Sequence, residues 1–193
     1  MDAKSILGII DEAGKKNLTS LNLFNKNITS LPPEIGMLTS LEHLDLSDNN
    51  LAELPKEIGQ LTNLKILNLE YNELETLPES IGLLTQLEEL ELGKNSLTTL
   101  PNGLSGLKQL RRLILRSNQL LETPPVLKTL SNLIELDLTD NELKKLNGFI
   151  GNLRQLQVLI VSENELEKIP LAVGNLQGLR HLDLSFNYIK RFP

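Results

Sequence analysis

The stretch LEHLDLSDNNLAELPKEIGQLTN at residues 41–63 decides the fold of this 193-residue chain. Its frame, L-x-x-L-x-L-x-x-N-x-L, recurs every 23 residues, and the copies begin at residues 18, 41, 64, 87, 110, 133, 156 and 179. The eighth copy is incomplete at residue 193. A fixed period of roughly 20 to 50 residues is typical of a stacked array in which each unit buries its apolar edge against its neighbours.

Each unit contains two structural rhythms. Over residues 43–47 the side chains alternate, with Leu44 and Leu46 inward, which predicts a short strand. Because a long crossover separates successive strands, we expect them to run parallel. Residues 51–61, with Pro55 and Gly59, predict a tight helical or 3-10 return segment on the opposite side. Strands are narrower than return segments, so the stack should bend with the strands on its concave face.

The frame resembles the leucine-rich repeat family. The ending L-P-x-x-I-G-x-L, at residues 31–38 and 77–84, resembles the 23-residue subclass found in bacterial, Roco-type and Ras-associated cytoplasmic proteins. The resemblance covers residues 18–193. It implies an α/β solenoid, namely a right-handed horseshoe with a concave parallel β-sheet of about eight strands and a convex side of short helical or 3-10 segments. It also implies that the chain binds proteins, usually through the concave face.

The chain divides into residues 1–17 and the repeats of residues 18–193. In the first segment, Asp2 is a candidate helix cap, and Gly14 with Lys15 and Lys16 is a candidate stop. Apolar residues recur between them at helical spacing: Ala3, Ile6, Leu7, Ile10 and Ala13. We therefore predict an amphipathic helix that covers the first strand.

The last unit ends before its return segment. Its core edge, which includes Leu182, Leu184 and Ile189, would lack a following repeat. Uncovered apolar edges promote association, so we expect that another domain follows, that this end self-associates, or that aromatic side chains cover it. The candidate aromatic residues are Phe186, Tyr188 and Phe192.

Asparagine recurs at the ninth position of every unit but the first. An inward amide both donates and accepts, so it can satisfy backbone groups left unpaired at a tight turn. We interpret these residues as a structural asparagine ladder rather than a ligand site: Asn49, Asn72, Asn95, Asn118, Asn141, Asn164 and Asn187. The first unit has Lys26 instead, which predicts a looser or solvent-open first turn.

Composition and spacing argue against several functions. The net charge of −6 is unfavourable for nucleic acid, and the apolar run at residues 6–10 is too short for a signal peptide or a membrane span. The lack of cysteine favours a reducing compartment or a bacterial origin. We expect a cytoplasmic protein, or alternatively an exported bacterial effector without a recognisable signal peptide.

Catalysis is not expected. The two histidines, His43 and His181, share one repeat position six units apart, which separates them by about 29 Å if strands lie about 4.8 Å apart. They cannot share a substrate or a metal, and no cysteine supplies a nucleophile. We therefore predict no catalytic residue, no metal and no cofactor.

Partner binding should use the outward residues of the strands. Ile114, Ile134, Val158 and Ile160 cluster on the fifth to seventh units and predict an apolar contact patch. Tyr71 is the expected aromatic anchor, because tyrosine is enriched at binding hot spots.

Charge on this face is also organised. Arg112 lies between Glu89 and Glu135 and should be satisfied within the sheet. Arg116 has the uncharged in-register neighbours Gly93 and Thr139, so it is the arginine expected to meet an outside carboxylate.

The remaining candidate contacts carry charge as well. Arg111 joins Arg116 on the fifth unit, beside Glu88. Basic groups of a partner should meet Asp45, Glu91 and Asp137. Together these residues predict a partner that combines an apolar group, one acid and several bases.

Three functions fit these sequence features. The first is a protein–protein interaction module or scaffold that binds a protein partner on its concave face. The second is a regulatory segment of a larger signalling protein, such as a Roco-type GTPase. The third is a structural protein that self-associates through its last repeat.

Overall fold

Each unit forms one coil, in which a strand turns sharply at its end and returns through a short 3-10 helix. The computed structural model describes residues 3–191, so the predicted roles of Asp2 and Phe192 lie outside the described residues. The elements are α1 (Ala3–Lys15), β1 (Ser20–Asn22), η1 (Pro33–Met37), β2 (His43–Asp45), η2 (Lys56–Gln60), β3 (Ile66–Asn68), η3 (Glu79–Leu83), β4 (Glu89–Glu91), η4 (Asn102–Gly106), β5 (Arg112–Ile114), η5 (Pro125–Thr129), β6 (Glu135–Asp137), η6 (Gly148–Asn152), β7 (Val158–Ile160), η7 (Leu171–Asn175) and β8 (His181–Asp183).

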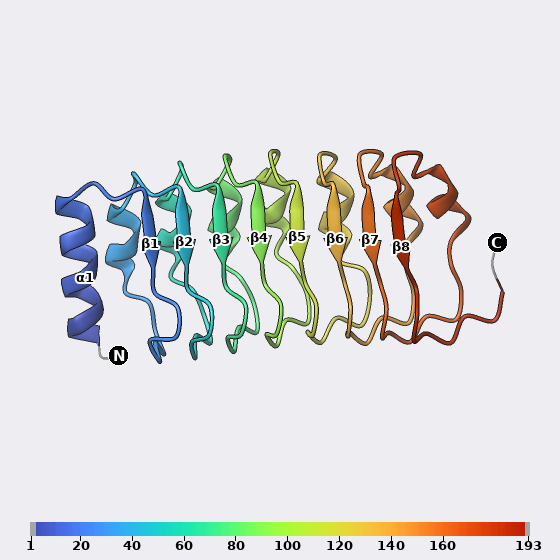
Figure 1. The fold of residues 1–193 in the computed structure, drawn as a ribbon, viewed down its shortest axis with the longest axis horizontal. Coiled ribbons are helices and arrows are strands. Elements are labelled where there is room, and N and C mark those ends of the chain that lie inside the picture. Colours follow the sequence, from blue (N-terminus) through green and yellow to red (C-terminus); the bar gives the residue numbers. More distant parts are fainter. Residues whose placement is uncertain (1–2, 192–193) are drawn as a thin grey trace.

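The strands form one parallel sheet in sequence order, β1 to β8. Every strand pairs with the next at an offset of one repeat, as in the pair Leu44↔Leu67. Figure 1 shows the strands side by side, the 3-10 segments behind them and α1 at one end of the row. The predicted solenoid with its parallel sheet of eight strands and its 3-10 returns is confirmed.

The core is a single layer of leucine repeated along the array. In the middle unit, Leu87, Leu90 and Leu92 are fully buried, as is Leu97 after the turn. Burying one such side chain stabilises the fold by roughly 1.5–3 kcal/mol. Because each layer is covered by the layers on both sides, no unit closes a core by itself.

The strands are two residues shorter than predicted. In the second unit the strand ends at Asp45, whose carboxylate accepts hydrogen bonds from the Ser47 backbone N–H at 3.0 Å and from the Ser47 hydroxyl at 2.6 Å. This side-chain turn accompanies the strand end but is not its cause, because β5 and β7 end at the same position with isoleucine. Asn22, Asn68, Asp137 and Asp183 accept the N–H two residues on in the same way.

The chain then turns through a left-handed residue at the eighth position of every unit. In the second unit this is Asp48, with φ 56°. The equivalent residues have similar φ values and include Tyr71 and Phe186, for which positive φ is unfavourable. The turn is therefore imposed by the surrounding hydrogen bonds rather than by local preference.

Those hydrogen bonds come from the asparagine ladder. The Asn118 side-chain oxygen accepts the Leu97 N–H at 2.9 Å, and its nitrogen donates to the carbonyls of Leu92 and Leu115, both at 3.0 Å. Each amide thus joins its own turn to the preceding unit. Within residues 3–191, no buried side-chain nitrogen or oxygen lacks a partner.

The first turn has a different backbone. Both Asn25 and Asn27 have positive φ there, whereas each later turn has one such residue. The side chain of Lys26 is exposed, and its backbone N–H donates to the Asn49 side-chain oxygen at 3.0 Å. A lysine can stand at the ladder position because its side chain does not enter the turn.

The N-terminal helix packs with Ile6, Ile10 and Ala13 buried, while Leu7 is 38% exposed. α1 ends at Lys15, within the stop predicted at Gly14, Lys15 and Lys16. Beyond the helix, Asn17 adopts the left-handed conformation (φ 48°), and Leu18 N–H donates to Ala13 O and Asn17 N–H to Gly14 O. This is the helix C-terminal motif that glycine or asparagine commonly closes.

Two departures from the repeat, one in the fifth return segment and one in the sixth, explain one another. Thr123 stands where other units have leucine or isoleucine, and Asn147 where they have proline. The buried Thr123 hydroxyl donates to Lys145 O and accepts the Asn147 backbone N–H, both at 3.1 Å. Proline at residue 147 would have no N–H to donate.

We expect Asn118→Ala to lower the free energy of unfolding by about 1–3 kcal/mol, because buried backbone groups of two units lose their partners. Urea titration followed by circular dichroism measures the change. Gln119→Ala, at the exposed next residue, is the control and should change stability by less than about 0.5 kcal/mol. Equal stabilities of the two variants would contradict the role of the ladder.

We expect Thr123→Leu and Asn147→Pro to be coupled. Each change alone breaks the shared hydrogen bond, whereas the double variant restores the pair of residue types found in the other units. Contacting residues have coupling energies of about 0.5–3 kcal/mol, so the double variant should be more stable than the sum of the single changes predicts. Additive losses in a double-mutant cycle would refute this account.

Candidate functional site

The sheet face is defined here as the residues at the second, third, fifth, seventh and eighth positions of each unit. It carries the whole net charge of the chain. Six of its residues are basic: Lys65, Lys94, Arg111, Arg112, Arg116 and Arg180. Twelve are acidic: Glu42, Asp45, Asp48, Glu70, Glu88, Glu89, Glu91, Glu135, Asp137, Asp140, Glu163 and Asp183.

The remaining positions of the sequence hold 13 acidic and 13 basic residues, from totals of 25 and 19. The net charge of −6 is therefore that of the sheet face. A face of one sign attracts partners of the other sign over roughly a Debye length, about 8 Å at physiological salt.

Arg112 occupies the centre of the face and is paired within the sheet. Its guanidinium contacts Glu91 closely, lies 3.3 Å from a carboxylate oxygen of Glu135, and lies 3.9 Å from Glu89. Burial disfavours its charge, but the Glu91 hydrogen bond and the neighbouring carboxylates outweigh burial and raise the pKa of Arg112. The sequence had suggested that Glu91 meets a basic group of a partner, but Glu91 is already paired with Arg112.

Arg116 has an ion-pair partner within the chain, although its in-register neighbours Gly93 and Thr139 are uncharged. It reaches across Gly93 to Glu70, two units away, and donates from Nε at 3.1 Å and from Nη2 at 3.0 Å to the two carboxylate oxygens. A Cβ at residue 93 would lie 2.5 Å from a Glu70 oxygen and 2.9 Å from the Arg116 Cγ. The missing side chain of Gly93 therefore makes room for an ion pair that in-register neighbours alone do not reveal.

Burial disfavours the charge of Arg116, yet the hydrogen bond with Glu70 and the Coulombic effects of Glu70 and Asp137 outweigh it. The pKa of Arg116 is raised as a result. The Arg116 side chain is 44% exposed and that of Glu70 is 12% exposed. The Glu70 carboxylate is thus the buried member of the ion pair, and the Arg116 guanidinium faces outward.

Ile114 is not available to a partner, because it is only 3% exposed. It is paired in register with Glu91 and Asp137 and lies between Arg112 and Arg116 in sequence. Long arginine side chains on one face can cover the apolar surface between them. Outward direction on a strand therefore did not mean exposure at this residue.

The rest of the predicted apolar patch is accessible in part. Ile134, Val158 and Ile160 are each half-buried, and Val158 and Ile160 share one face of β7. Tyr71 is 46% exposed, and the Lys94 ammonium lies 4.6 Å from the centre of its ring. This is a cation–π arrangement.

The aspartates of the face have structural partners. Asp137 is 9% exposed and accepts from the Thr139 N–H and hydroxyl. Asp45 has the same role at Ser47. In the last unit the Ser185 N–H lowers the pKa of Asp183. By contrast, Arg111 is exposed, and its Nε lies as far as 3.9 Å from the nearest Glu88 carboxylate oxygen. The charge of Arg111 therefore remains accessible.

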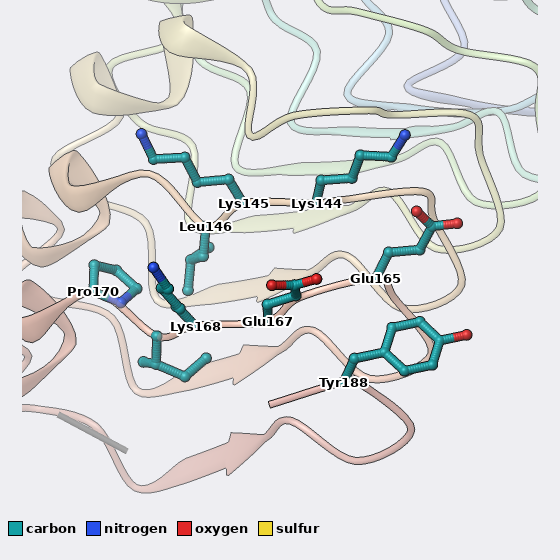
Figure 2. A pocket seen from close by; sticks show the side chains of 9 residues that line it. Lys144, Lys145, Leu146, Glu165, Glu167, Lys168, Pro170 and Tyr188 are labelled. Carbon is teal, nitrogen blue, oxygen red and sulfur yellow. The ribbon is translucent and has the colours of Figure 1, made fainter. Parts of the chain in front are cut away.

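A groove of about 740 Å³ lies away from the sheet face, at the edge formed by the last three units. Figure 2 shows its lining, in which the ammonium groups of Lys144 and Lys145 point in opposite directions. Glu165, Glu167 and Tyr188 complete its polar border. These charges do not converge on one point, so the groove offers no arranged set of ligands.

The face does not form a metal or catalytic centre from the described residues. Between residues 3 and 191, no three His, Cys, Asp or Glu side chains are placed to hold a metal ion. His43 and His181 lie on β2 and β8 at opposite ends of the sheet. No helix among the described residues is long and apolar enough to cross a membrane.

In the last unit, the exposed apolar side chains are Leu182, Phe186 and Tyr188, and Leu171 precedes them on η7. Leu184 and Ile189 are partly buried against the core. The final layer is therefore less covered than the inner ones.

A family model of a leucine-rich repeat region matches residues 15–136. A leucine-rich repeat protein of Leptospira interrogans is 41% identical with a TM-score of 0.91, and the match covers 94% of this chain and 47% of that one. No curated protein matches. This chain thus spans about half the length of the Leptospira protein.

Two further solved structures are similar. The leucine-rich repeat ectodomain of the Arabidopsis thaliana receptor kinase GASSHO1/SCHENGEN3, in complex with Casparian strip integrity factor 2, is 33% identical with a TM-score of 0.66, covering 91% of this chain and 25% of that one. An internalin of Listeria monocytogenes is 25% identical with a TM-score of 0.70, covering 98% and 59%.

We expect Gly93→Ala to separate Arg116 from Glu70, because the added Cβ occupies the space of their contact. In a cycle of Glu70→Gln and Arg116→Gln, the coupling energy should be about 0.5–1 kcal/mol, as for partly exposed pairs, and close to zero in the Gly93→Ala background. Gly148→Ala is the control, since no atom lies within 4 Å of its added Cβ. Undiminished coupling in the Gly93→Ala background would contradict this geometry.

Proposed function

The chain belongs to the leucine-rich repeat family, and we propose that it is a protein-binding module whose partner lies on the sheet face. Proteins of this family are generally interaction modules rather than enzymes. The observation that carries the proposal is the concentration of the whole net charge of −6 on this face. It supports a partner that presents a basic surface.

Several features of the face suit such a contact. Arg112 has the carboxylates of Glu89, Glu91 and Glu135 around it, so this part of the face keeps a net negative charge that would attract basic groups of a partner. Preorganised charges lose little side-chain freedom on binding. We assign the electrostatic part of recognition to this central region.

The apolar part of the contact is assigned to Val158 and Ile160, with Ile134 beside them. All three are half-buried, so a partner side chain would complete their burial. Tyr71 supplies an aromatic contact on the opposite side of the arginines. The proposed footprint runs from the third to the seventh unit.

Sequence similarity gives this proposal a precedent of a limited kind. The plant receptor ectodomain that resembles the chain forms a complex with Casparian strip integrity factor 2. That complex supports binding as a use of the fold. For the chemical class of the partner, the negative charge of the sheet face is the more direct evidence.

Two alternatives from the sequence have observations of their own. The chain matches only 47% of the Leptospira protein, which is compatible with a regulatory segment of a larger signalling protein. The exposed Phe186 and Tyr188 favour self-association through the last unit. The lack of cysteine leads us to propose a cytoplasmic location, or export as an effector.

Affinity capture with matched variants tests the proposal. Val158→Lys with Ile160→Lys places two cations on the sheet face and should abolish capture of a basic, partly apolar partner. Leu83→Lys, which changes a 59% exposed leucine on η3, is the control and should leave capture unchanged. The captured proteins are identified by mass spectrometry, and raised salt should weaken their binding.

The reverse pattern would place the binding site elsewhere. If Leu83→Lys abolished capture and the double variant did not, the partner would bind the 3-10 side. Circular dichroism of each variant ensures that the comparison concerns folded protein.

A further inference from the structure

We infer that the Arg116 guanidinium, with Lys94 and Tyr71 beside it, is a binding site for a single carboxylate of the partner. The inference rests on the proposed protein-binding function of the sheet face and adds a local exception to it. The face as a whole favours bases, whereas this point favours one acid.

The guanidinium has unused donors on its outer side. Arginine has five N–H groups in a planar fork. Glu70 engages Nε and Nη2, and within residues 3–191 no acceptor is bonded to the other donors. Because the Arg116 side chain is 44% exposed, a carboxylate from outside can bind this second edge in the same bidentate way.

A second cation lies close to the pair. Lys94 directly follows Gly93, the residue that the ion pair crosses, and its ammonium lies over the ring of Tyr71, the residue after Glu70. Among the described residues, no carboxylate lies within 4.0 Å of the Lys94 ammonium. The cluster therefore contains two cations and the hydrogen-bonded carboxylate of Glu70, and the carboxylate of Asp137, which accepts from Thr139, acts on Arg116 from nearby.

Arg112 provides the contrast. It has three carboxylates around its guanidinium, from Glu89, Glu91 and Glu135. A fourth carboxylate would be repelled by these charges. The two arginines belong to one unit and one face, yet Arg112 has carboxylates of three residues within 4.0 Å, whereas Arg116 has that of Glu70.

The partner group that fits is an aspartate or glutamate side chain surrounded by basic residues. The basic residues match the acidic face, and the acid meets the exposed edge of the Arg116 fork, in the unit next to Lys94, whose backbone N–H donates to Arg116 O. Glu70 is a positioning residue, because it holds the fork with its open edge outward.

Synthetic peptides test this assignment on the whole chain. The probe is acetyl-Lys-Lys-Asp-Lys-Lys-amide, and the matched control peptide has Asn in place of Asp. Titrations followed by NMR report the Arg Nε–Hε signals and the backbone amides of Gly93 and Lys94. We expect the Asp peptide to bind about threefold more tightly and to shift the Arg116 signal, as suits a partly exposed ion pair.

Variants locate the effect. Arg116→Gln should remove the preference for Asp over Asn, and Lys94→Gln should reduce it. Arg112→Gln is the control, in which the preference should persist although both peptides bind more tightly to the uncompensated carboxylates. Circular dichroism shows whether each variant is folded.

Equal affinities of the two peptides for the wild type, or a preference that survives Arg116→Gln, would overturn the carboxylate site. If both peptides nevertheless shift the amides of the sheet face equally, the basic-partner proposal stands while the carboxylate site fails. If neither peptide shifts any signal of the face, both are refuted. Tighter binding of a phosphoserine peptide than of the Asp peptide would assign the site to phosphate instead.

Discussion

The side-chain amides of the asparagine ladder are the constraint on which the other features depend. A turn through a left-handed residue leaves backbone groups facing the interior, and a buried amide or carbonyl without a partner costs about 1–3 kcal/mol. The Asn118 amide satisfies groups of its own unit and of the preceding one. The ladder therefore holds Tyr71 and Lys94 at positive φ and spaces the units uniformly.

Uniform spacing converts the sequence into a surface pattern. Residues 23 apart in the sequence become neighbours in register. Each row of side chains across the sheet face therefore consists of the residues at one repeat position. The charge pattern follows directly from this arrangement, with Arg112 between Glu89 and Glu135. Long side chains can also pass over a small residue, as Arg116 does at Gly93 to reach Glu70. That diagonal contact gives the face its most distinctive chemistry.

Much of the fold followed from the repeat alone, because both the strand alternation and the ladder positions are local patterns. The parallel sheet is such a case. The strand ends were predicted two residues too late, because every unit turns through a left-handed residue at its eighth position whether or not an Asn or Asp stands at the fifth. After the N-terminal helix the left-handed residue is Asn17, since asparagine as well as glycine adopts this conformation.

The sequence by itself determined the array, its register and the acidity of the sheet face, since these depend only on spacing and composition. Tertiary structure decided which outward side chains are accessible. Ile114 points outward but is only 3% exposed, and Arg116 lacks charged in-register neighbours but pairs with Glu70 two units away. Both outcomes depend on the reach of long, flexible side chains, whose paths across a surface are set by three-dimensional packing rather than by repeat position.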